Sequence, residues 1–269
     1  MRPVETYLHA LGNIRASGAG VAETSYYSPL EQLLTAVGAM LSPRVHCIIH
    51  LRNAGAGIPD GGFFTPDQLR GHAGDDFPSP LPARGALEIK SPSDEVVAVA
   101  RSMQVARYVA RYGQVLVTNY RDFLLVGRDS SGQPILLEPY HLAQSEAAFW
   151  SALALLGNLA ATHEERLTDY LRRVLVHAAP LETPADVAWV LASYAREART
   201  RIERAELPAL ASVRAALESS LGLTFQGTRG EHFSGPRWFR RSSTASSPPG
   251  SSGARSSRWA AARRPSTGA

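Results

Sequence analysis

The sequence is almost free of lysine and cysteine. Of its 28 lysine and arginine residues only Lys90 is a lysine, and Cys47 is the one cysteine. A single cysteine excludes an intrachain disulfide framework and is typical of a reducing compartment, so we expect a cytoplasmic protein. The chain also lacks a run of the roughly 18 apolar residues that would cross a bilayer. Glu5 stands where an export signal would carry positive charge, and no apolar signal core follows it.

Acidic residues are missing from the C-terminal segment 234–269, which holds seven arginines and ten serines. The whole chain carries a net charge of +4 and this segment +7, so residues 1–233 carry −3 and must bind any DNA through local arginine patches. With almost no aliphatic residues, the segment is predicted to be disordered. It is either a basic tail that binds nucleic acid without specificity or the frameshifted product of a GC-rich gene.

Hydrophobic periodicity in the first 140 residues predicts helices and strands in alternation. Helices are expected over 28–41, where Ser28 and Pro29 form a start signal, and over 94–112. Strands are expected at the following positions, the last two as a hairpin: 44–51, 58–65, 86–90, 114–119 and 122–127. The Gly- and Pro-rich stretch 66–84 is expected to be a surface loop. This order predicts an α/β fold in which helices flank a mixed sheet.

The composition changes after residue 140, where Ala, Leu, Glu and Arg become frequent. Three or four helices are predicted there, over 144–158, 161–178, 184–204 and 208–221. They form either a scaffold without chemistry of its own or a coupling domain on the sheet. We therefore expect three parts: an α/β domain over 1–140, a helical domain or linker over 141–233, and the disordered tail over 234–269.

Lys90 is the first candidate for chemistry. A chain that uses arginine for nearly every positive charge is expected to keep a lysine where a compact donor with an adjustable pKa is needed. Because side chains alternate along a strand, Glu88 and Lys90 leave the same face. Asp60, in the run Gly57-Ile-Pro-Asp-Gly-Gly62, supplies a second acid. A Pro-Asp-Gly turn or a Glu-x-Lys pair is common by itself, so the prediction depends on their combination.

This combination predicts a metal-dependent site that cleaves phosphodiester bonds. Such cleavage needs a divalent cation that polarises the phosphate and helps to generate hydroxide. Mg²⁺ prefers oxygen ligands and keeps several waters, so two or three protein oxygens suffice. Asp60, Glu88 and the backbone carbonyl of Ile89 are the predicted ligands, and Lys90 is expected to orient or help deprotonate the attacking water.

Four further side chains are candidates for the same site. Glu23 or Glu31, just before and within the first predicted helix, would complete the metal shell, although both are also typical surface acids. Gln104 and Tyr108 are one helical turn apart, so both can reach one site. The alternative for Tyr108 is a place in the core.

Three arginines recur along the predicted helix 94–112, namely Arg101, Arg107 and Arg111. Phosphate oxygens of DNA are commonly bound by arginine side chains, which position a protein without reading the base sequence. These arginines are therefore either DNA contacts or an ordinary solvated helix face.

The order of elements, taken with three short motifs, resembles the PD-(D/E)xK nuclease superfamily. The motifs are Pro59-Asp60, Glu88-x-Lys90 and Gln104-xxx-Tyr108, the last similar to that of RecB-type members. The resemblance implies a restriction-endonuclease-like mixed sheet and a Mg²⁺-dependent deoxyribonuclease.

More narrowly, residues 1–233 resemble the N-terminal portion of large single-chain restriction-modification enzymes. Two segments carry this likeness, 57–62 and Tyr112-Gly-Gln-Val-Leu-Val-Thr-Asn-Tyr-Arg-Asp-Phe123. In such enzymes an N6-adenine methyltransferase and a target-recognition region follow. Here the likeness stops at Phe233, and no Asn-Pro-Pro-Tyr-like motif is present. We therefore expect a truncated or frameshifted form without methylating activity.

The sequence thus predicts the DNA endonuclease portion of a restriction-modification enzyme. Two alternatives remain open. One is a fragment that binds DNA or a protein partner without cutting, and the other is a degraded gene product of poor solubility.

Overall fold

The computed structural model describes residues 2–20, 23–51, 57–70, 80–177, 179–180, 183–204 and 219–220. The chain divides into two compact units, Met1–Ala198 and Arg199–Ala269, and the features below belong to the first, apart from residues 199–204 at the end of the last helix. The predicted tail and all but two residues of the predicted helix 208–221 lie outside the described residues. None of the described helices is long and apolar enough to cross a membrane.

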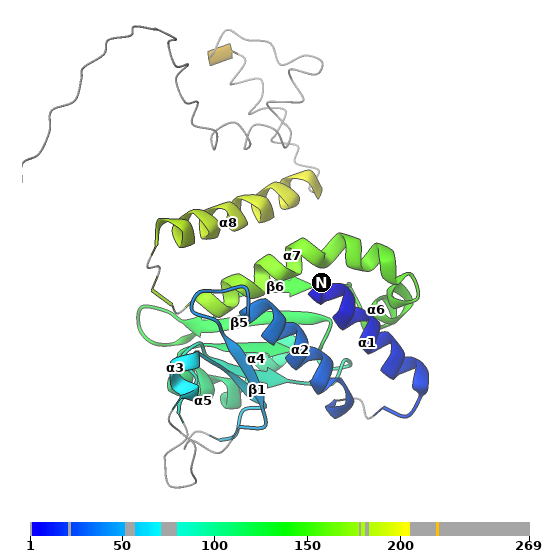
Figure 1. Ribbon diagram of the computed structural model, residues 1–269, viewed down its shortest axis with the longest axis horizontal. Helices are drawn as coiled ribbons and strands as arrows, with labels where there is room; N and C mark the ends of the chain where they lie inside the picture. Colours follow the sequence, from blue (N-terminus) through cyan, green and yellow to red (C-terminus); the bar gives the residue numbers. More distant parts are fainter. Residues whose placement is uncertain are drawn as a thin grey trace, which may run out of the picture. The chain divides into compact units, whose positions relative to one another are not determined.

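The described part of the first unit contains one six-stranded mixed sheet in the order β1-β2-β3-β4-β5-β6 (Figure 1). Its strands are β1 (His46–Ile49), β2 (Gly61–Phe64), β3 (Ala86–Ile89), β4 (Val115–Thr118), β5 (Asp122–Arg128) and β6 (Pro134–His141). All neighbours are antiparallel except β3 and β4, which are parallel. The α/β class and the mixed sheet expected from the sequence are confirmed. Strands β1 to β4 are each shorter than the ranges that the sequence predicts.

Eight α-helices accompany the sheet in the described residues. They are α1 (Pro3–Ser17), α2 (Tyr27–Gly38), α3 (Pro66–Leu69), α4 (Val96–Ala100), α5 (Met103–Tyr112), α6 (Glu146–Leu153), α7 (Leu156–Val176) and α8 (Pro184–Arg204). The single helix predicted over 94–112 is wrong, because Ser102 starts a new one: its hydroxyl accepts a hydrogen bond from the backbone N–H of Val105 at 3.2 Å. The helix predicted over 144–158 is likewise two helices, α6 and the start of α7.

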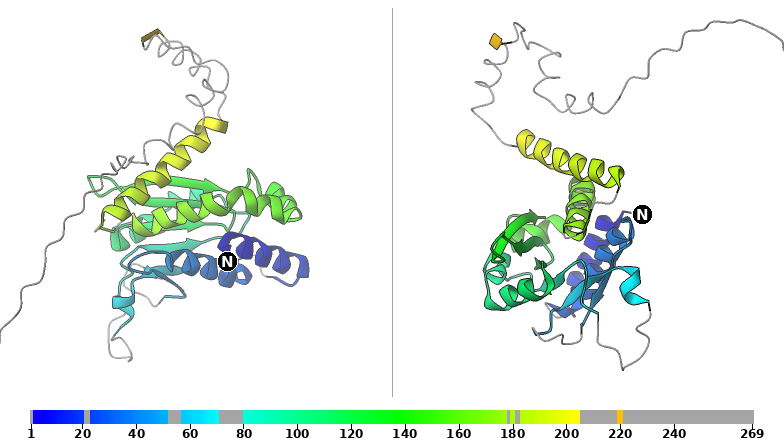
Figure 2. Two further views of the ribbon diagram at one scale, coloured as in Figure 1. Left: turned by 45° about the horizontal axis from the view of Figure 1, so that its top comes forward. Right: turned by 90° about the vertical axis from the view of Figure 1, so that its left-hand side faces the viewer.

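The helices cover both faces of the sheet (Figures 1 and 2). Helices α1, α2, α6 and α7 pack on one face, and α4 and α5 pack on the other. Strand β3 contributes to both cores, since Leu87 and Ile89 enter the first and Ala86 enters the second. Glu88 has the parity of Ala86, so its side chain leaves the sheet toward α4 and α5.

Strand β6 and helix α1 are among the elements that the sequence did not predict. Strand β6 is an edge strand that carries Pro134 and Pro139, and proline is tolerated at a sheet edge because one side needs no ladder hydrogen bonds. Helix α1 begins with backbone N–H groups of Val4 and Glu5 that donate to the Glu164 carboxylate of α7, at 3.2 and 2.9 Å. Helix α7 therefore caps α1 and shares a core with the sheet. The domain boundary expected at residue 140 stays a prediction.

The excursion between β2 and β3 begins with helix α3 and not with the predicted loop. Its two ends are tied together by Gln68, whose side chain donates to the carbonyl of Leu81 and accepts from the N–H of Ala83 at 3.1 Å. The N–H of Phe63 also donates to the carbonyl of Gly85, at 3.0 Å. The base of the excursion is thus closed by its own hydrogen bonds.

Candidate active site

Asp60 and strand β3 meet at one end of the sheet. Gly61 starts β2 and pairs with Leu87 of β3, so Asp60 lies beside the end of β3. Its Oδ2 accepts a hydrogen bond from the backbone N–H of Ile89 at 2.8 Å, and its carbonyl accepts one from the N–H of His50 at 2.7 Å. The side chain and the backbone of Asp60 are therefore both held by neighbouring strands.

Glu88 and Lys90 form a close ion pair on the same face of β3. Lys90 Nζ lies 2.6 Å from Glu88 Oε1, and the side chain of Glu88 is 1% exposed against 28% for Lys90. The second oxygen, Glu88 Oε2, is buried and has no hydrogen-bond partner among the described residues. A buried carboxylate oxygen without a partner is costly, so this one is available to a ligand.

The surroundings shift the pKa of both members of this pair. Burial raises the pKa of Glu88, and the charges of Asp60 and Glu23 act in the same direction, while Lys90 opposes them. Burial lowers the pKa of Lys90, but the hydrogen bond and charge of Glu88, with the charges of Asp60 and Glu23, outweigh it and raise that pKa. Lys90 is therefore a cation at neutral pH.

Gln104 and Tyr108 reach the site from α5, as their spacing predicts. Gln104 Nε2 donates to Glu88 Oε1 and to the Tyr108 hydroxyl, both at 3.1 Å. The Tyr108 hydroxyl donates to the carbonyl of Ile58 at 2.9 Å. Its ring lies against Gly57, which has a φ of 102° and where a Cβ would come within 3.3 Å of the ring. The two side chains thus connect Glu88 to the segment that precedes β2.

Sequence reasoning missed two tyrosines that bring Glu23 to the site. The Tyr27 hydroxyl, at the start of α2, donates to Glu23 Oε1 at 3.1 Å and to Asp60 Oδ1 at 3.4 Å. The Tyr120 hydroxyl donates to the backbone carbonyl of Glu23. Burial, with the charges of Asp60 and Glu23, raises the pKa of Tyr27, so its hydroxyl keeps its proton. The only local signal was the i, i+4 spacing of Glu23 and Tyr27.

Glu31, the other predicted acid, lies one helical turn beyond Tyr27 on α2. Burial has the largest effect in raising the pKa of the Cys47 thiol in β1, and the negative charge of Glu31 raises it further. Cys47 pairs with Phe63, two residues into the β1–β2 ladder from Gly61. The charge of Glu31 thus acts on Cys47, and no described hydrogen bond joins Glu31 to the other candidate acids.

A cation would find two carboxylates and one backbone carbonyl at this end of the sheet. No three His, Cys, Asp or Glu side chains within the described ranges form a complete metal cage. The C=O of Ile89 leaves β3 on the same side as its N–H, which is the side that Asp60 occupies. Mg²⁺ commonly keeps several waters and takes one or two carboxylates. The unpartnered oxygen of Glu88 and the adjacent Asp60 fit such an ion.

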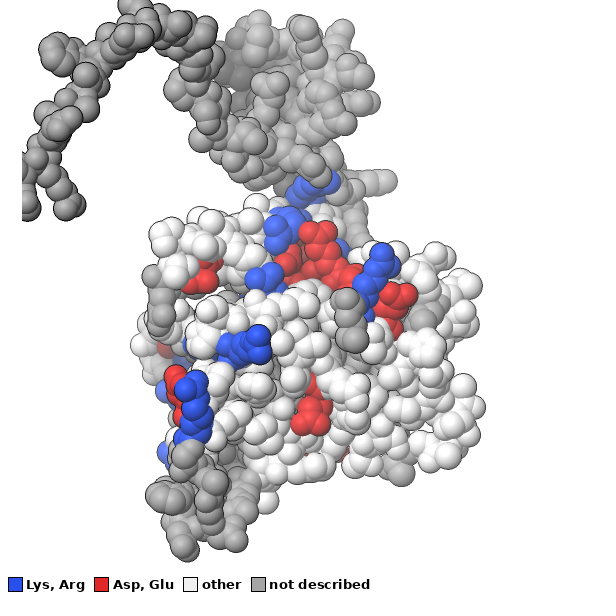
Figure 3. Space-filling view, viewed as in Figure 1, with Lys and Arg blue, Asp and Glu red and all other residues white. Residues whose placement is uncertain are grey.

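Two exposed arginines lie on the face of α5 that also carries Gln104 and Tyr108. Arg107 is three residues from Gln104, and Arg111 is three from Tyr108, so each lies next to the stripe that enters the site. Neither forms an ion pair with any residue in the described part of the chain. Arg101 is also exposed, but it ends α4. On the molecular face in Figure 3, positive and negative side chains are interspersed, so no broad surface of one sign is seen there.

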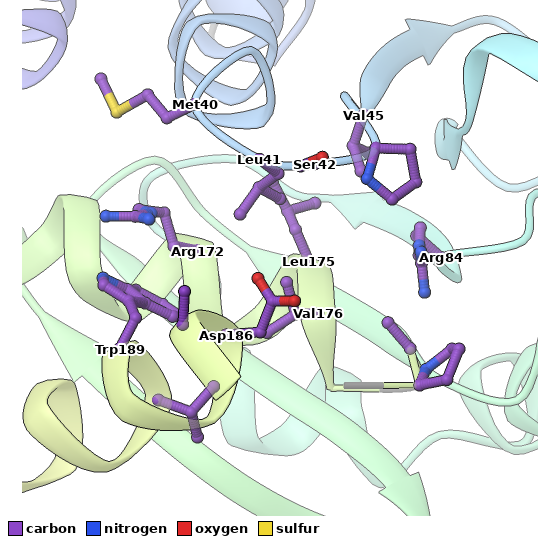
Figure 4. Close-up of a pocket in the computed structure, with 15 residues that line it drawn as sticks. Met40, Leu41, Ser42, Val45, Arg84, Arg172, Leu175, Val176, Asp186 and Trp189 are labelled. Carbon is purple, nitrogen blue, oxygen red and sulfur yellow. The ribbon is translucent and has the colours of Figure 1, made fainter. Parts of the chain in front are cut away.

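A separate cavity of about 280 Å³ lies between the α2–β1 connection and helices α7 and α8 (Figure 4). One wall is aliphatic, and on another the Arg172 guanidinium stacks 4.0 Å from the ring centre of Trp189. None of the candidate carboxylates lines this cavity. The residues predicted to carry the chemistry therefore lie outside this cavity.

Comparisons with known proteins add a limited likeness. No protein-family model matches the chain, and no curated protein matches it either. Four chains of solved structures match, among them one from a cryo-EM structure of a DrdV–DNA complex, at 19% identity and a TM-score of 0.39. That match covers 57% of this chain and 94% of the other. A likeness at this level supports no conclusion about activity, so the function has to be inferred from the side chains themselves.

Proposed function

We propose that this protein is a metal-dependent deoxyribonuclease with a PD-(D/E)xK type of site. The observation that carries the proposal is the hydrogen bond from the Ile89 N–H to Asp60 Oδ2, at 2.8 Å. It joins Asp60 to the strand that holds the Glu88–Lys90 pair, although 27 residues separate the two acids in the sequence. Two acids and a lysine at one end of a sheet supply what hydrolysis of a phosphodiester requires.

Each side chain has a definite role in this proposal. Asp60, Glu88 and the carbonyl of Ile89 would hold Mg²⁺, which polarises the phosphate and lowers the pKa of bound water. Lys90, as a cation, holds the attacking water in line with the phosphorus and balances negative charge on the phosphate. Gln104 fixes the orientation of Glu88 through Oε1 and leaves Oε2 for the ion.

We infer further that the nuclease works with a DNA methyltransferase and a target-recognition region, as in restriction-modification enzymes. Support comes from the two sequence segments that resemble such enzymes. Residues 57–62 carry Asp60 and contact Tyr108, and residues 112–123 include β4, which pairs with β3. Both segments therefore surround the proposed site.

The first experiment is incubation of supercoiled plasmid with the full chain in Mg²⁺, Mn²⁺ or EDTA. We expect nicking that requires the metal, and no nicking by Asp60→Asn, which keeps an oxygen to accept from Ile89 but loses the charge that binds the ion. Nicking at equal rates by wild type and Asp60→Asn would refute the proposed site. A DNA shift on a gel without any cleavage would favour the alternative, a binding fragment that does not cut.

The arginines of α5 are expected to bind phosphate. Arg107→Gln and Arg111→Gln should each weaken DNA binding in EDTA and reduce the slope of log affinity against log salt by about 1, because each arginine releases about one counterion. Arg44→Gln is the matched control: Arg44 is also exposed but lies before β1, at the opposite end from His50. Equal salt slopes for all three variants would contradict this prediction.

A further inference from the structure

The cavity between the α2–β1 connection and helices α7 and α8 has a size and a lining that suit a small ligand. Its volume of about 280 Å³ is at the lower limit of the roughly 300–1,000 Å³ that is typical of ligand pockets. Leu41, Val45 and Leu175 line it with aliphatic carbon (Figure 4). The part of a ligand that contacts these residues is therefore expected to be apolar.

The charged side chains of the lining favour an anion. They are two arginines, Arg84 and Arg172, and one acid, Asp186, which together carry a net charge of +1. The acid is already used at the start of α8, because Asp186 Oδ2 accepts hydrogen bonds from the hydroxyl and the N–H of Thr183, at 2.7 and 3.1 Å. A positively charged ligand would meet two arginines and an acid with one oxygen already occupied.

Arg172 differs from the other arginines of α7 in lacking an acidic partner. Arg166 pairs with Glu197 at 3.6 Å, and Arg173 Nε donates to Glu138 at 3.3 Å. Arg172 forms no ion pair with any residue in the described part of the chain, and its Nε is buried without a hydrogen-bond partner. Arginine is rarely buried unless it is paired, and a buried donor without an acceptor is costly. A ligand that accepts hydrogen bonds would remove this cost.

The neighbours of Arg172 hold it in the cavity wall without neutralising it. Its guanidinium lies 4.0 Å from the ring centre of Trp189, and the indole Nε1 of Trp189 is also buried without an acceptor. Burial lowers the pKa of Arg172 despite the opposing charge of Asp169, which is itself bound to Arg196 at 2.7 Å. Two neighbouring donors on this wall therefore lack an acceptor.

We infer that this cavity binds a small organic anion, with its carboxylate or phosphate group at Arg172 and its apolar body among Leu41, Val45 and Leu175. A guanidinium forms charge-assisted hydrogen bonds with both kinds of anion. The inference goes beyond the proposed function and does not depend on it, because none of the residues of the proposed nuclease site lines the cavity.

The test is calorimetric titration of the full chain with octanoate, hexyl phosphate and octan-1-ol, in the absence of DNA and metal. We expect at least one of the two anions to bind about tenfold more tightly than the uncharged alcohol, and the tighter of the two identifies the anionic group. Arg172→Gln should weaken binding of that anion by about tenfold or more, as is typical for loss of a hydrogen bond to a charged group, and leave binding of the alcohol unchanged.

Arg15→Gln is the matched control, since Arg15 also stacks on a tryptophan, 4.9 Å from the ring centre of Trp150, but does not line the cavity. Val190→Trp places a larger side chain in the lining and should prevent binding of all three probes. The melting temperature of each variant shows whether a loss of binding comes from unfolding.

Three results would each overturn the inference. The first is that neither anion binds the wild type more tightly than octan-1-ol does. The second is equal binding of the anion by Arg172→Gln and Arg15→Gln, which would show that Arg172 does not contact it. The third is wild-type binding by a folded Val190→Trp variant, which would place the probes elsewhere on the protein.

Discussion

Lys90→Ala is expected to slow metal-dependent nicking of plasmid DNA by about 10²- to 10³-fold, the range typical for loss of one preorganised charged donor. The fold should survive, because the side chain of Lys90 is partly exposed and its backbone N–H still donates to the carbonyl of Thr118 at 2.9 Å. The measurement is the initial nicking rate at saturating Mg²⁺, with far-ultraviolet circular dichroism to monitor folding.

Lys90→Arg separates charge from geometry. Arginine keeps the positive charge but replaces a compact ammonium group by a wide planar fork. The contact between Lys90 Nζ and Glu88 Oε1, at 2.6 Å, leaves little room for that fork. We expect Lys90→Arg to be nearly as inactive as Lys90→Ala. A rate near that of the wild type would show that only a positive charge is needed, and the role of Lys90 in placing the water would be wrong.

Glu88→Gln is expected to abolish cleavage without lowering thermal stability. Removal of this proposed metal ligand should cost at least about 10³-fold in rate, since polarisation by the ion is worth several kcal/mol and each 1.4 kcal/mol is a factor of ten. The amide of glutamine can occupy the same volume beside Lys90 and Gln104 and carries no buried charge.

The pKa of Glu88 determines whether Glu88→Gln raises or lowers the melting temperature at a given pH. The carboxyl pKa of Glu88 is raised in the folded protein, mainly by burial, so the folded state binds this proton more tightly than the unfolded chain does. The stability that Glu88 contributes is present below its unfolded pKa and is lost as the pH rises through its folded pKa. The melting temperature of Glu88→Gln should therefore equal or exceed that of the wild type at neutral pH, and the difference should shrink in acid. A variant that melts lower at neutral pH would show that the ion pair with Lys90 outweighs burial.

Local periodicity predicted much of this site. Alternation along a strand placed Glu88 and Lys90 on one face, and helical spacing placed Gln104 and Tyr108 on one stripe. Both rules act over a few residues and do not depend on the rest of the fold. The order of the predicted helices and strands likewise indicated a mixed sheet, because each element is recognised from its own local periodicity.

The tyrosines could not be found in this way. Tyr27 is followed by Ser28, and Tyr120 lies between Asn119 and Arg121, so no local pattern marks either as a site residue, and both are buried. Their hydroxyls act on partners far away in the sequence: Tyr27 on Asp60, 33 residues later, and Tyr120 on Glu23, 97 residues earlier. Tyr120 also adopts a φ of 73°, which a sequence pattern of strand and turn residues does not predict. Such contacts depend on tertiary packing.

The closed base of the β2–β3 excursion has a consequence for how this chain can vary. Gln68 and the pairing of Phe63 with Gly85 fix both ends of the excursion, so its length has little influence on the distance between Asp60 and β3. Doubling a flexible loop costs only about 0.6 kcal/mol in closure entropy. A segment of another length could therefore be inserted between β2 and β3 while the hydrogen bond between Asp60 and Ile89 is kept.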